Sequence, residues 1–173
     1  MTERLGIGYR ADMALEWRPA GMQPDVPPEQ VLRSVITLEE LSGASEDALA
    51  AGTQHEAGRL EFKLDLLLDL VGALLEQAVT QPPRQAVELR VTGLRILQPD
   101  WQPEPGAKGA LALYIHPNYP RPLVLPARIA QVDASAIQFE FGELDENTRT
   151  LLERFIFIHH RRAVAQQHRP PAP

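Results

Sequence analysis

The chain has 173 residues, is 44% hydrophobic and 23% charged, and carries a net charge of -6, which is typical of one folded domain. The negative charge gives no general attraction to phosphate backbones, so the composition disfavours nucleic-acid binding. The absence of cysteine excludes disulfides, thiol catalysis and cysteine-ligated zinc. Because no basic-then-apolar leader follows Met1 and no apolar stretch is long enough to cross a bilayer, we expect a cytoplasmic protein without membrane insertion.

The first half of the chain predicts one strand followed by two helices. Residues Tyr9–Trp17 (YRADMALEW) alternate in the manner of a strand. A first helix over residues 29–41 is expected to have Pro28 in its first turn, where the missing N–H costs nothing, and to end at Ser42 and Gly43. A second helix begins near residue 45 or 53 and continues to about residue 80, where a Gln-Pro-Pro sequence ends it.

The second half predicts strands and one last helix. Four segments show two-residue alternation: 85–98 (QAVELRVTGLRILQ), 109–117 (GALALYIHP), 123–132 (LVLPARIAQV) and 135–144 (SAIQFEFGEL). Asp145 is expected to cap a helix over residues 146–167, whose Leu151, Leu152, Phe155 and Ile158 should be buried against the sheet. The fold class is therefore α+β: a small antiparallel barrel or curled sheet, interrupted after its first strand by an inserted helical segment, residues 29–80.

The second helix carries more leucine than one side of a surface helix needs. Its apolar residues recur at alternating spacings of four and three, the a/d pattern of a coiled coil: Leu60, Leu64, Leu67, Val71, Leu74 and Ala78. Leu68 and Leu75 widen this seam, which favours more than two helices in the contact. The alternative is that the seam packs on the first helix and the sheet of its own chain. We predict a homo-oligomer held by residues 53–80, a homotetramer or at least a homodimer, and the width of the seam favours the tetramer.

No catalytic or metal-binding pattern stands out. His159 and His160 are adjacent, so on a helix they point about 100° apart and do not converge on one metal. His116 is a lone histidine beside a proline. The sequence therefore favours a binding or assembly protein over an enzyme, with no metal and no cofactor.

The C-terminal half resembles the end of a PilZ domain, a bacterial family. The resemblance rests on the segment LVLPARIAQVDASAIQFEFGELDENTRTLLERFIFIHHRR, with VELRVTGLRI as the central strand and YRADMALEW as the opening strand. It covers residues 6–18 and 86–166 and implies a six-stranded antiparallel barrel closed by a C-terminal helix. The inserted helices are similar to those of the atypical, tetrameric PilZ subgroup. We therefore expect a single PilZ-like domain over residues 1–173.

PilZ domains ordinarily bind cyclic di-GMP through an Arg-x-x-x-Arg stretch and an Asp/Asn-x-Ser-x-x-Gly stretch. By this resemblance the candidate ligand residues are Arg10, Glu88, Arg90 and Gly93. Gly6 stands where the first arginine belongs, Glu88 replaces the Asp or Asn, and Arg90 replaces the serine. These departures predict weak or no binding of cyclic di-GMP, and we interpret Arg10 and Arg90 as solvated charge on strand faces.

The resemblance implies a non-catalytic protein of cyclic di-GMP signalling that regulates motility or virulence through oligomerisation and contacts with other proteins. The alternative is an oligomeric scaffold or adaptor unrelated to nucleotide binding. An enzyme with an unrecognised site has the least support from the sequence.

Overall fold

The computed structural model describes residues 7–21, 24–50, 64, 67, 68, 71 and 81–167. Six strands form a closed antiparallel barrel in the order β1-β2-β3-β6-β5-β4. The strands are β1 (Gly8–Pro19), β2 (Arg84–Arg90), β3 (Gly93–Leu97), β4 (Lys108–Tyr114), β5 (Leu123–Val132) and β6 (Ala136–Phe141). Within the described ranges, the helices that can be followed from end to end are α1 (Pro28–Ala50) and α3 (Glu146–Gln167). The predicted six-stranded barrel is confirmed.

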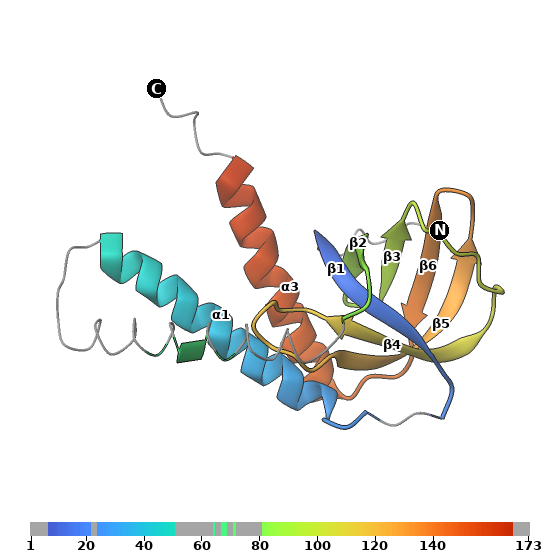
Figure 1. Ribbon diagram of the computed structural model, residues 1–173, viewed down its shortest axis with the longest axis horizontal. Helices are drawn as coiled ribbons and strands as arrows, with labels where there is room; N and C mark the ends of the chain where they lie inside the picture. The colour runs from blue at the N-terminus through green and yellow to red at the C-terminus, as the bar shows by residue number, and fades with distance from the viewer. Residues whose placement is uncertain are drawn as a thin grey trace.

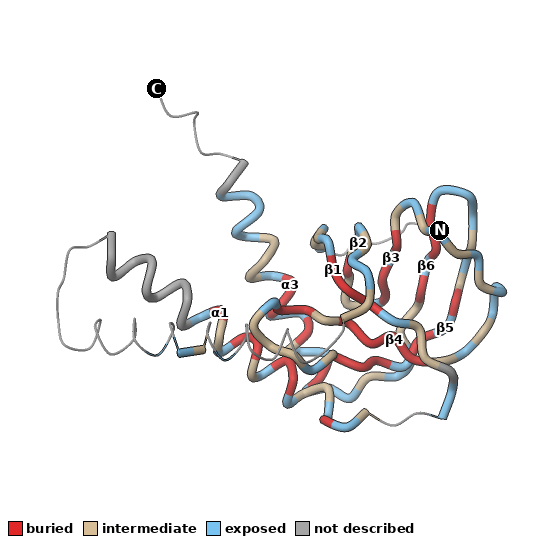
Figure 2. The backbone as a smooth tube through the Cα atoms, viewed as in Figure 1, coloured by how far each residue is buried: buried red, intermediate tan, exposed pale blue. Residues whose placement is uncertain are grey.

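Strand β1 closes the barrel because it is long enough to serve two neighbours. Its first half pairs with β2, and its second half, from Ala14 to Pro19, pairs with β4. The interior is filled by alternate aliphatic and aromatic side chains from all six strands, among them Met13, Leu89, Leu111, Ile129 and Phe139, each 2% exposed or less. Figure 2 shows this concentration of buried residues inside the barrel.

Both helices start beside the barrel and diverge from it (Figure 1). Helix α1 begins at Pro28, which confirms the predicted first-turn proline. Asp145 caps α3 as predicted: its Oδ1 accepts a hydrogen bond of 2.9 Å from the Thr148 backbone N–H. In α3, Leu152 and Phe155 are fully buried as predicted, whereas Leu151 and Ile158 are half-buried; Ile156 is 1% exposed and completes the buried face.

Two predicted element boundaries were wrong. The segment 85–98 is two strands, β2 and β3, joined by a tight turn at Val91 and Thr92. Both are strand-forming residues, so the alternation continues through the turn without the usual Asn-Gly signal. Helix α1 continues through Ser42 and Gly43 to Ala50, because one glycine costs a helix only about 1 kcal/mol and does not end it.

The inserted segment is described only in part. Leu64, Leu67, Leu68 and Val71 are helical, as predicted for the second helix. Leu60, Leu74 and Ala78 lie outside the described residues. None of the helices within the described ranges is both long and apolar enough to cross a membrane.

Candidate functional site

The strand register brings three of the four motif residues together on the outside of the barrel. Arg10 of β1 lies directly opposite Glu88 of β2. Arg90 follows two residues later on the same face of β2, since successive side chains of a strand alternate. Val87 and Leu89, which flank Glu88 in the chain, are buried and point into the barrel.

The Glu88 carboxylate is held between the two arginines. Arg90 donates to Glu88 Oε1 from Nε at 2.9 Å and from Nη2 at 2.6 Å, and Arg10 Nε lies 3.5 Å from Glu88 Oε2. The hydrogen bonds from Arg90 lower the pKa of the Glu88 carboxyl; partial burial opposes this, and the charges of Arg90 and Arg10 reinforce it. Glu88 therefore stays ionised and neutralises part of the positive charge that a phosphate would seek.

Gly93 has a structural reason for being glycine. It pairs with Arg90 on one side and with Glu140 of β6 on the other. A Cβ atom at this position would lie 2.1 Å from the backbone oxygen of Phe139, a distance that no side chain tolerates. Gly93 thus permits the close approach of β6 to the β2–β3 hairpin.

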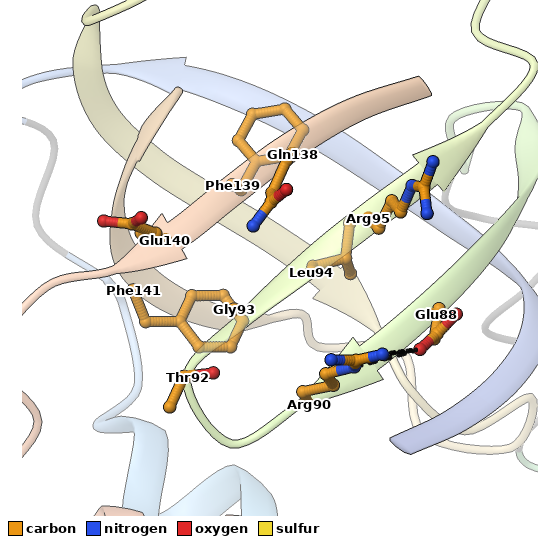
Figure 3. Close-up of a pocket in the computed structure, with 10 residues that line it drawn as sticks. All are labelled: Glu88, Arg90, Thr92, Gly93, Leu94, Arg95, Gln138, Phe139, Glu140 and Phe141. Atoms are coloured by element: carbon orange, nitrogen blue, oxygen red, sulfur yellow. Dashed lines mark hydrogen bonds and ion pairs between the residues drawn. The ribbon is translucent and has the colours of Figure 1, made fainter. Parts of the chain in front are cut away.

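These residues border a cavity of about 520 Å³ on the β2, β3 and β6 side of the barrel. Figure 3 shows the Arg90–Glu88 pair at one side of this cavity and Glu140 across it. Glu140 accepts a hydrogen bond of 3.0 Å from Arg128 Nε. The cavity is lined by Glu88, Arg90, Thr92, Gly93, Leu94, Arg95, Gln138, Phe139, Glu140 and Phe141. Two carboxylates, from Glu88 and Glu140, thus border this cavity together with the guanidinium groups of Arg90 and Arg95.

The described residues of the predicted oligomer seam are exposed within a single chain. Leu64 is 47% exposed, Leu67 58% and Val71 50%, while Leu68 is half-buried. Three large aliphatic side chains at spacings of three and four thus form an apolar stripe that the described part of the chain does not cover.

A second polar arrangement, which the sequence did not predict, lies where α1 meets α3. Glu39 of α1 is only 8% exposed, and its Oε1 lies 3.3 Å from Nε2 of His159 and 3.8 Å from Nε2 of His116. Arg162 forms an ion pair with Glu39 Oε2 and donates from Nη2 to the Glu39 backbone oxygen at 2.9 Å. We call Glu39, His116, His159 and Arg162 the Glu39 cluster.

The contacts of the Glu39 cluster shift the pKa values of Glu39 and Tyr9 strongly and in opposite directions. Burial alone would raise the pKa of Glu39, but the contacts from His159 and Arg162 outweigh it and lower the pKa to about 2. Tyr9 stacks on His159, with ring centroids 4.6 Å apart, and burial together with the Glu39 charge raises the pKa of Tyr9 to about 12. Glu39 is therefore a fixed anion and Tyr9 a neutral phenol.

The cluster links α1 to α3, because Glu39 and Arg162 lie on different helices. Within the described ranges, no group of three or more His, Asp or Glu residues is arranged to hold a metal ion. The sequence did contain one signal for it: Val31, Val35 and Glu39 follow one another at a spacing of four, which places Glu39 on the apolar face of α1.

Comparison with known proteins agrees with this architecture. The family model described as "Atypical PilZ domain, cyclic di-GMP receptor" matches residues 32–169. No curated protein is similar enough to match the chain. A solved structure of a pathogenic protein from Xanthomonas campestris, a tetrameric PilZ domain self-assembled via an unusual helical bundle, aligns with a TM-score of 0.70 and 26% identity. The alignment covers 94% of this chain and 92% of that one.

Members of the matched family are receptors and not enzymes, which confirms the prediction of a binding or assembly protein. The match extends over far more than half of the chain, and the barrel is the one that the motif resemblance implied. The chain belongs to the atypical PilZ domain family.

Proposed function

We propose that this chain is a cytoplasmic, oligomeric protein of bacterial cyclic di-GMP signalling that acts through contacts with other proteins and binds cyclic di-GMP poorly or not at all. The observation that supports weak or absent binding of cyclic di-GMP is the position of Glu88. Its carboxylate already occupies the guanidinium groups of Arg90 and Arg10, the groups that would otherwise grip the phosphates of a dinucleotide.

The energetic argument concerns what a ligand would have to displace. A phosphate reaching Arg90 must replace the two hydrogen bonds that this guanidinium donates to the Glu88 carboxylate, so it gains only the difference between the two anions as acceptors. It must also approach the negative charges of Glu88 and Glu140, which border the same cavity. The motif arginine replaced by Gly6 would contribute nothing to offset these costs.

Calorimetric titration with cyclic di-GMP tests this part of the proposal. The unmodified protein should show no binding below high-micromolar concentration. The triple variant Gly6→Arg, Glu88→Asp, Arg90→Ser restores the motif and should bind, and adding Arg10→Ala to it should weaken binding again. Tight binding by the unmodified protein would refute the proposal; failure of the restored variant would favour the scaffold that is unrelated to nucleotides.

The oligomeric part of the proposal rests on the exposed stripe of Leu64, Leu67 and Val71. Burying an aliphatic side chain of this size contributes roughly 1.5–3 kcal/mol, so leaving three together in water is a liability unless a partner covers them. The similar protein from Xanthomonas campestris is a tetramer assembled through a helical bundle. We propose that residues 53–80, within the inserted segment 29–80, form the corresponding contact in a homotetramer of this chain.

Light-scattering mass measurement tests the assembly. Leu67 is 58% and Val71 50% exposed in one chain, so Leu67→Asp with Val71→Asp should leave the barrel intact and break the contact between copies. The mass should fall while the strand signal in circular dichroism stays. Ile7→Asp is a matched control, because Ile7 is also 50% exposed but lies immediately before β1. An unmodified protein that is monomeric at micromolar concentration would contradict the proposal.

A further inference from the structure

The cavity on the β2, β3 and β6 side of the barrel has opposite charges on opposite sides. Gly93, which has no side chain, pairs with Arg90 on one side and with Glu140 on the other. Neighbouring strands lie about 4.8 Å apart, so the backbones of Arg90 and Glu140 are about 10 Å apart. Figure 3 shows the Glu140 carboxylate on one side of Gly93 and the guanidinium groups of Arg90 and Arg95 on the other. A ligand in this cavity therefore lies between a negative and a positive side.

Arg95 supplies positive charge that no ion pair neutralises. In the strand register it lies opposite Glu88. The Glu88 carboxylate is held instead by Arg90 and Arg10. Arg95 is exposed and forms no ion pair within the part of the chain that the structure describes. Its guanidinium group, a planar fork of N–H donors, is therefore available to the carboxylate of a ligand.

Glu140 supplies a hydrogen-bond acceptor on the other side. Arg128 donates from Nε and Nη2 to the same oxygen of Glu140, Oε2, which leaves Oε1 without a hydrogen bond among the described residues. Arg128 belongs to β5 and is not one of the residues that line the cavity. The Glu140 side chain is 45% exposed. Its Oε1 atom can therefore accept hydrogen bonds from a cationic group in the cavity.

We propose that this cavity binds a short zwitterionic peptide, with the ligand's carboxylate on Arg95 and its ammonium group on Oε1 of Glu140. The proposal goes beyond the function proposed above, because it assigns a ligand class to a cavity in which cyclic di-GMP is expected to bind weakly. The cavity volume of about 520 Å³ lies within the range of roughly 300–1,000 Å³ that is usual for small-ligand sites.

The charges around the cavity favour a ligand that carries both signs. Two carboxylates, from Glu88 and Glu140, and two guanidinium groups, from Arg90 and Arg95, border it, so their formal charges cancel. A dianion would meet the two carboxylates and a dication the two guanidinium groups, whereas a zwitterion places each of its charges beside the opposite one. An extended dipeptide spans about 7 Å. Because the two side chains cover the remaining distance, the terminal charges of a dipeptide can reach both sides of the cavity.

Isothermal titration calorimetry on the full-length chain tests the charge requirement with three matched ligands. Glycylglycine carries both charges, N-acetylglycylglycine only the negative one and glycylglycinamide only the positive one. Glycylglycine should bind, and each derivative should bind at least about tenfold more weakly, because it lacks one charge-assisted contact. Equal binding of glycylglycine and either derivative would overturn the proposal, as would no binding of glycylglycine. Neither result would alter the expected weakness toward cyclic di-GMP or the proposed oligomer.

Two substitutions test which end of the ligand each side chain contacts. Arg95→Gln should weaken glycylglycine binding at least about tenfold and leave the weak binding of glycylglycinamide unchanged. Glu140→Gln should weaken glycylglycine binding equally and leave the weak binding of N-acetylglycylglycine unchanged. Arg84→Gln is the matched control, because Arg84 is an exposed arginine of β2 that does not line the cavity, and it should leave all three affinities unchanged. A loss in the control as large as in Arg95→Gln would show a general effect of net charge and would overturn the assigned site.

Discussion

The barrel wall and the α1–α3 junction both hold a glutamate between basic side chains, but in different surroundings. Glu88 faces Arg90 and Arg10 on the outside of the barrel, and the Arg10 side chain is 78% exposed. Glu39 is enclosed by Arg162 and two histidines, with only 10% of its side chain exposed. The two carboxylates are similarly covered, with 13% of the Glu88 side chain and 10% of the Glu39 side chain exposed. Their partners differ: water reaches Arg10, whereas the His116 and His159 side chains are only 10% and 17% exposed. The ion pairs of Glu88 therefore reduce the positive charge on the outside of the barrel, whereas those of Glu39 hold α1 against α3.

Truncation of Phe155, in the apolar layer beneath the Glu39 cluster, should have the largest effect on stability. Phe155 is fully buried and packs against Tyr9 and His159, with ring centroids 5.9 and 4.5 Å apart. Phe155→Ala should lower the free energy of unfolding by about 3–5 kcal/mol, because it leaves a cavity between α3 and the barrel. Denaturant unfolding measures it. Ile158→Ala, at a half-buried position of the same helix, should cost less than half as much; equal costs would mean that Phe155 does not anchor the helix.

Removing the buried carboxylate should have the next largest effect. Glu39→Ala leaves His159 and Arg162 without their anion and should cost about 3 kcal/mol, at the low end for a broken buried pair because Arg162 can turn toward water. The neighbouring Glu40 is a matched control, since its ion pair with Arg154 is exposed. Glu40→Ala should cost less than about 1 kcal/mol. Similar losses for the two variants in chemical denaturation would show that burial does not distinguish them.

The stability of the protein should depend on pH at acidic pH because of Glu39. Glu39 has a pKa of about 2 in the folded protein against an ordinary value of 4.5, so the unfolded chain takes up this proton first as the pH falls. The stabilisation from ionised Glu39 is complete above pH 4.5 and is lost between 4.5 and 2, and linkage makes it about 3 kcal/mol. Unfolding free energies measured across this range should fall less steeply for Glu39→Gln than for the unmodified protein. Parallel curves would contradict the assigned role.

Local patterns predicted most of the barrel. Alternation of Ile137, Phe139 and Phe141 placed β6, and Asp145 placed the start of α3, because both signals lie within a few residues of the feature they specify. The turn at Val91 and Thr92 was missed because its residues are themselves good strand formers. A local pattern thus fails where the residues carry the propensity of the wrong element.

The electrostatics of both glutamates depended on contacts that no local pattern contains. The motif spacing placed Glu88 and Arg90 on one strand face, but the approach of Arg10 follows from the register of β1 against β2. Glu39 and Arg162 are separated by 123 residues, and their meeting requires both helices to pack at the same place on the barrel. Prediction from sequence thus reached Arg10, Glu88 and Arg90 as candidates but not the ion pairs among them, and it did not reach the Glu39 cluster.

The smallest expected effect belongs to Glu88, and it separates a structural role from an effect on ligand binding. Glu88→Ala should change the free energy of unfolding by less than about 1 kcal/mol, because Arg90 and Arg10 are free to reorient into water once the carboxylate is gone. The same substitution removes one of the two negative charges beside the cavity and leaves both guanidinium groups available. Binding of inorganic pyrophosphate, followed by calorimetry, should therefore be stronger in Glu88→Ala than in the unmodified protein. Glu140→Ala, which leaves the Arg90–Glu88 pair in place, should give a smaller gain; a large loss of stability in Glu88→Ala would instead assign Glu88 to the barrel's structure, as Glu39 is assigned to the helix junction.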